Sequence, residues 1–62
     1  MMQHNAVVQL FRSREAQSPD ETVEFSFASA AREYARNQIN EGKARRAVVR
    51  DRDGKVIETF PA

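Results

Sequence analysis

The 62-residue sequence contains no cysteine and no tryptophan, and it has only two glycines, two prolines and one histidine. Without cysteine, a disulfide scaffold and a thiolate metal site are excluded, and the composition is more typical of a cytoplasmic than of a secreted small protein. A run of ~20 apolar residues, which a membrane-spanning helix needs, is also missing. The first residues lack the pattern of a signal peptide. We therefore expect a cytoplasmic chain that uses no cofactor, no metal and no membrane.

What the sequence does contain is enough for one small folded domain. Apolar residues make up 40% and charged residues 31%, a balance of globular rather than disordered chains. A chain this short buries only about 60% of its unfolded surface, so its stability margin is small. We predict a single domain over 1–62, with residues 1–5 frayed. His4 is then a solvated side chain rather than a ligand or a base.

Two segments in the N-terminal half have the character of strands. Residues 6–12 are rich in β-branched and aromatic side chains, and no helix start precedes them. Residues 22–27 alternate, so that Val23, Phe25 and Phe27 point to one side and polar side chains to the other. The second segment is therefore expected to be a half-exposed strand.

A helix is predicted over 30–41, where good helix formers predominate. We expect Ser29 or Ser26 to cap its N-terminus and Gly42 to end it. One narrow apolar stripe occurs at helical spacing, at Ala31, Tyr34, Ala35 and Ile39. The two alanines in this stripe allow the helix to approach a sheet closely.

Residues 45–50 and 56–60 predict a hairpin, with two possible registers for its turn. A two-residue turn would place Arg52 opposite Lys55, which is a pair of like charges. A three-residue turn, with Gly54 in the left-handed conformation, would place Asp51 opposite Lys55 and would set Val49 against Ile57. Because opposite charges stabilise cross-strand pairs, we favour the three-residue turn.

The predicted order is thus ββαββ, an α+β fold with one helix packed on one face of a four-stranded, mostly antiparallel sheet. Three of the four strands carry apolar residues on both sides, whereas an exposed sheet face normally alternates. Either strand ends and twist bury these residues, or a second copy covers them; we favour a homodimer. The candidate self-association residues are Val7, Phe11, Val48, Val56 and Phe60.

The charges are unevenly distributed, although the net charge is only +1. Residues 15–24 carry four acidic and no basic side chains, whereas residues 43–55 carry six basic and two acidic ones. Arginine suits bidentate contacts with phosphate, but the isoelectric point is lower than the ~9 of dedicated nucleic-acid binders. The basic residues can equally protect an edge strand or pair with the acidic segment. The candidate anion-binding or nucleic-acid-binding residues are Arg32, Arg36, Arg45, Arg46, Arg50 and Arg52.

A catalytic arrangement is not recognisable in the sequence. Both glycines are assigned to turns, so no glycine-rich loop remains to bind a phosphate, and one histidine supports no nucleophile–base pair. We therefore expect a non-enzymatic protein-interaction or regulatory module. The alternative is a nucleic-acid-binding accessory domain that uses the arginine-rich surface.

Overall fold

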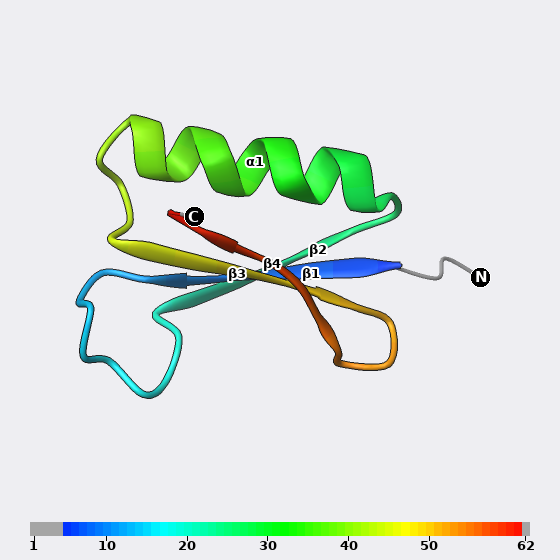
Figure 1. Cartoon of the computed structure of the whole chain (residues 1–62), viewed down its shortest axis with the longest axis horizontal. Helices are drawn as coiled ribbons and strands as arrows, with labels where there is room; N and C mark the ends of the chain where they lie inside the picture. The colour runs from blue at the N-terminus through cyan, green and yellow to red at the C-terminus, as the bar shows by residue number, and fades with distance from the viewer. Residues whose placement is uncertain (1–4, 62) are drawn as a thin grey trace.

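The computed structural model describes residues 5–61, which form four strands and one helix (Figure 1). The elements are β1 (Ala6–Phe11), β2 (Glu21–Phe25), α1 (Ala28–Asn40), β3 (Arg46–Asp51) and β4 (Val56–Phe60). The predicted α+β fold with ββαββ order is therefore confirmed, and the ends of the elements differ from the predicted ones by at most two residues.

The strands lie in the order β2-β1-β3-β4, and every neighbouring pair is antiparallel. Strands β1 and β3, which hold most of the buried strand residues, form the centre of the sheet. Val8 of β1 is paired with Val49 of β3, and both side chains are fully buried. The edge strand β2 exposes Thr22 and Glu24, which agrees with the alternation in its sequence. Burial thus follows position in the sheet, with the edge strands more exposed than the central ones.

Helix α1 lies along one face of the sheet, which we call the helix face, and the opposite face is the open face (Figure 1). The predicted apolar stripe is confirmed, since Ala31 and Ala35 are fully buried and Tyr34 and Ile39 pack against the core. The Tyr34 ring lies 5.1 Å from the ring of Phe25 on β2, measured between centroids. Alanine at the closest contacts therefore lets a helix of 13 residues approach the central strands.

The N-terminus of α1 differs from the prediction. Strand β2 ends at Phe25 instead of 27, so the helix begins at Ala28 and the N-cap position falls on Phe27. Ser29 then lies inside the first turn, and among residues 5–61 no side chain makes a capping hydrogen bond here. Phe27 leaves the side of the sheet predicted for it and is 68% exposed. Both the serine cap and the placement of Phe27 were wrong, because the strand is shorter.

The C-terminus of α1 ends as predicted at Gly42, whose φ of 73° is left-handed. The amide of Gly42 donates to the carbonyl of Ile39 at 3.1 Å, and the amide of Lys43 donates to that of Gln38 at 2.9 Å. This pair of bonds is the Schellman motif, which satisfies the last carbonyls of a helix. Glycine is favoured at this position because a Cβ is strained in the left-handed conformation.

The β3–β4 hairpin has the three-residue turn that we favoured. The amide of Asp51 donates to the carbonyl of Lys55 at 2.9 Å, and Gly54 has a φ of 86°. A register shift follows, however, because Arg50 pairs with Val56 while Val49 pairs with Glu58. The predicted pairing of Val49 with Ile57 was therefore wrong: Ile57 is the additional residue of a β-bulge.

At the start of the described chain, Asn5 makes two hydrogen bonds to the residues at the end of β2. Its amide donates to the carbonyl of Phe25 at 3.0 Å, and its side-chain Nδ2 donates to the carbonyl of Ser26 at 2.9 Å. The rest of the predicted frayed terminus, including His4, lies outside the described residues.

Candidate functional site: an arginine-lined end

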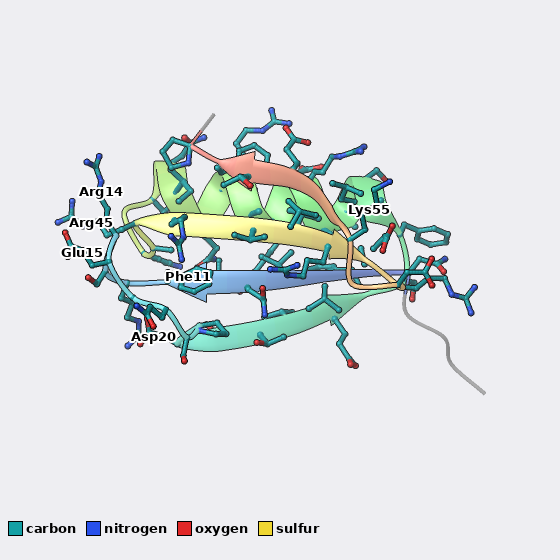
Figure 2. The ribbon with its side chains drawn as sticks, turned by 60° about the horizontal axis from the view of Figure 1, so that its bottom comes forward. Phe11, Arg14, Glu15, Asp20, Arg45 and Lys55 are labelled. Carbon is teal, nitrogen blue, oxygen red and sulfur yellow. The ribbon has the colours of Figure 1, made fainter. Side chains whose placement is uncertain are left out.

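Three arginines from two distant segments gather at one end of the sheet. Arg12 and Arg14 follow β1, and Arg45 precedes β3; together with Ser13 and Glu15 they line a concavity of 280 Å³. We call this surface the arginine end. Figure 2 shows Arg14, Arg45 and Glu15 at the same end of the molecule, with Lys55 at the opposite end.

The pairing of β1 with β3 brings these segments together. In an antiparallel pair the end of one strand lies beside the start of the other, and here Phe11 is paired with Arg46. The amide of Arg45 extends this contact by donating to the carbonyl of Phe11 at 2.8 Å. Backbone hydrogen bonds thus hold the two segments side by side, although they are far apart in the sequence.

The connection between β1 and β2, residues 12–20, is also held by hydrogen bonds. The amide of Asp20 donates to the carbonyl of Leu10 at 2.8 Å, and Oδ2 of Asp20 accepts the amide of Arg12 at 2.8 Å. Within the connection, the amide of Ala16 donates to the carbonyl of Ser13 at 3.3 Å. The connection therefore has a defined shape at the point where it supplies two cations.

Arg46 attaches this connection to the open face. Its guanidinium carbon lies 4.0 Å from the centroid of the Phe11 ring, while Nη2 donates to the carbonyl of Ala16 at 3.0 Å and Nη1 to that of Arg14 at 3.4 Å. Its Nε is buried and finds no acceptor among the described residues. The cation–π contact and the two hydrogen bonds make Arg46 a structural residue under the arginine end.

The cations of the arginine end have no partner of their own within the described chain. Between residues 5 and 61, the guanidinium groups of Arg12, Arg14 and Arg45 make no hydrogen bond or ion pair. The nearby carboxylate of Glu15 accepts a long bond of 3.4 Å from the Ser13 hydroxyl. A guanidinium is always charged and binds carboxylate or phosphate with two parallel bonds. This end is therefore suited to an anionic group.

The structure does not gather the six arginines that the sequence suggested as one anion-binding surface. Arg32 pairs with Glu58 at 3.0 Å, and Arg36 is exposed on α1. Arg50 lies on the open face and donates to Oε1 of Gln9 at 2.8 Å and to the carbonyl of Gly54 at 2.9 Å. Arg52 lies in the β3–β4 turn, and Arg46 is engaged with Phe11, so Arg45 is the member found at the arginine end.

Sequence reasoning missed Arg12 and Arg14, which we had counted outside the basic segment. Their basic character was visible in the sequence, but the pairing of β1 with β3 was not. An antiparallel pairing of residues 6–12 with 45–50 would have placed the end of the first segment against Arg45. Assuming this strand pairing would have been enough to predict the site from the sequence.

The five candidate self-association residues are divided between the two faces. Phe60 is part of the core on the helix face, opposite Ala47. The other four lie on the open face, but the chain itself covers two of them: Phe11 is 5% and Val48 is 8% exposed. Val7 is half-buried, and Val56 on the edge strand β4 is 45% exposed.

Metal-binding clusters and membrane-spanning helices are two further features that the described residues lack. In the part of the chain from 5 to 61, no three His, Cys, Asp or Glu side chains gather where they could hold a metal ion. Over the same residues, no helix is both long enough and apolar enough to cross a membrane. No family model, curated protein or solved structure matches this chain.

Proposed function

We propose that this chain is a small, non-enzymatic interaction module that binds an acidic segment of a partner protein at the arginine end. The observation that supports it is the convergence of Arg12, Arg14 and Arg45 around one concavity, where none of the three forms an ion pair with another residue of 5–61. A guanidinium does not give up its proton near neutral pH, so these groups serve as fixed cations rather than acids or bases.

The covered aromatic rings favour a protein over a nucleic acid. Single-stranded nucleic acids are bound by basic grooves combined with exposed rings on which bases stack. Phe11 lies beneath Arg46, Tyr34 packs against Phe25, and Phe60 belongs to the core. The exposed Phe27 lies at the N-terminus of α1, whereas the arginine end lies beyond its C-terminus. A nucleic acid would therefore be bound at the arginine end through its phosphates alone. For this reason a nucleic-acid-binding accessory domain is only the second candidate.

Self-association is part of the proposal, with a second copy meeting this one along β4. Among the described strands, β4 pairs with β3 alone, and Val56 is exposed on it. Two antiparallel edge strands related by a two-fold axis are self-complementary. Sedimentation equilibrium at ~100 μM checks this, because micromolar association is visible there. The native chain should be a dimer and Val56→Glu a monomer, and a monomeric native chain would reject the dimer.

The cytoplasmic location is also a proposal, and it rests on the cysteine-free composition.

The function is tested by titrating the full chain with a short Asp-rich peptide and, in parallel, with an oligothymidylate. The site variant replaces three cations by glutamine, at Arg12, Arg14 and Arg45. The matched control removes the same charge elsewhere, at Arg36, Arg52 and Lys55, all of which are exposed. We expect the peptide to bind the native chain and the control variant, and the site variant to lose that binding. Affinity should fall with added salt, because exposed charges are screened.

The other outcomes decide between the candidates. Binding of the oligothymidylate without binding of the peptide would replace the proposal by the nucleic-acid reading. Equal loss in the control variant would show that net charge, rather than the arginine end, determines binding. No binding of either ligand at low ionic strength would reject the arginine end as a docking surface.

A further inference from the structure

A second concavity adjoins the arginine end and shares two of its arginines. It has a volume of 330 Å³, close to the lower limit of ligand pockets, which is about 300 Å³. Arg14 and Arg45 belong to both concavities. The remaining lining residues are Ile39, Gly42, Ala44 and Pro61, from the end of α1, the α1–β3 connection and the end of β4.

The two kinds of lining residue differ in chemistry. The side chains of Ile39, Ala44 and Pro61 are aliphatic, and Ala44 lies buried at the base of the concavity. The Schellman motif that ends α1 satisfies its own carbonyls through the amides of Gly42 and Lys43, so these groups are not available to a ligand. The only polar side chains of the lining are therefore those of the two arginines, and Ile39 and Pro61 provide aliphatic surface beside them.

We infer that the second concavity receives an aliphatic side chain of the partner, directly next to the carboxylate that Arg14 and Arg45 bind. This inference rests on the proposed function and adds the chemical class of the recognised segment: an acidic residue adjacent to Leu, Ile or Val. A bare phosphate or a run of acidic residues would satisfy the arginines but leave the aliphatic wall in contact with water. Burial of an aliphatic group supplies the selectivity, since apolar area removed from water is favourable.

The test uses the full chain, labelled with ¹⁵N, and two peptides of equal length and charge. One peptide contains Asp-Leu and the other contains Asp-Ser at the same position. We expect the Asp-Leu peptide to bind about tenfold more tightly, the discrimination typical of a small apolar pocket. The amide signals of Ile39 and Ala44 should shift with this peptide and stay in place with the other, whereas that of Arg45 should shift with both.

Because the difference lies in the peptide, the test does not depend on a variant that has to fold. As a second measurement, Ile39→Ala should reduce the preference, and circular dichroism shows whether this variant is folded. Equal affinity for the two peptides would overturn the inference and leave the proposed function intact. If the Asp-Leu peptide binds more tightly but changes the amide signals of residues on the open face, the aliphatic side chain binds elsewhere and the second concavity is not its site. No binding of either peptide would reject the proposed function together with the inference.

Discussion

The guanidinium carbon of Arg46 on β3 lies 4.0 Å above the ring of Phe11, its neighbour on β1, and the same guanidinium holds the carbonyls of Arg14 and Ala16. One side chain thus covers an aromatic ring on the open face and anchors the connection that supplies two cations to the arginine end. Stability and the shape of the candidate site are coupled at this residue.

This coupling predicts different effects for two substitutions. Arg46→Lys keeps the charge but loses the planar fork, so the two carbonyl bonds cannot both be kept. We expect Arg46→Ala to lower the free energy of unfolding by about 2 kcal/mol and Arg46→Lys by about half of that. In both variants the amide of Ala16 should exchange faster with solvent. Urea titration and hydrogen exchange measure the two effects, and Arg36→Lys is the control on α1. Unchanged exchange at Ala16 would show that Arg46 does not hold the connection.

The close approach of α1 to the sheet makes a second prediction. Ala35 is fully buried between helix and sheet, whereas Ala30 is exposed on the same helix. Ala35→Leu adds volume where no space exists, and overpacking costs about 1–3 kcal/mol. Ala30→Leu should leave the stability almost unchanged, because the propensities of alanine and leucine are similar. Thermal unfolding of the two variants checks this. Equal melting temperatures would mean that the interface between α1 and the sheet has room for a larger side chain at position 35.

Gly42 allows a third prediction, at the end of α1. Its φ of 73° is left-handed, and a Cβ placed there would meet no atom within 4 Å, so backbone strain is the only cost. Gly42→Ala should lower the free energy of unfolding by about 1–2 kcal/mol. Gly42→Asn should cost less, because asparagine tolerates this conformation. A Gly42→Ala variant as stable as the native chain would contradict the Schellman ending.

The ion pair between Arg32 and Glu58 allows a fourth prediction, with a small effect. Both side chains are nearly half exposed, so water screens the 3.0 Å contact. Replacing Glu58 by glutamine should change the free energy of unfolding by less than about 1 kcal/mol. Chemical denaturation at low and high salt measures it. A loss as large as that of Arg46→Ala would show that this pair, and not the open face, carries the electrostatic stability of the domain.

Local patterns in the sequence were sufficient to predict the elements. The stripe around Ala31 and Ala35 was read correctly, and the alternation of 22–27 was read correctly as far as Phe25, where the strand ends. The N-cap was missed because several residues compete for it, and Phe27 takes the position only because the strand before it ends early. Propensity cannot resolve a difference of two residues at such a boundary.

Long-range geometry is what the sequence did not reveal. The bulge at Ile57 turns two successive side chains toward the helix face, so Glu58 meets Arg32, and no local signal specifies it. The arginine end depends in the same way on the pairing of β1 with β3, which brings Arg12 within reach of Arg45. Charge counts along the chain therefore favoured 43–55, whereas the arginine end combines residues that follow β1 with one that precedes β3.

The connection 12–20 is tied to the rest of the structure in two ways, since Arg46 holds it against the open face and it carries Arg12 and Arg14. Deleting residues 12–14 would remove two of the three cations of the arginine end and, with the carbonyl of Arg14, one of the two acceptors that hold Arg46 over the ring of Phe11. Point substitutions and insertions in this connection are therefore better tolerated than deletions that reach its first three residues.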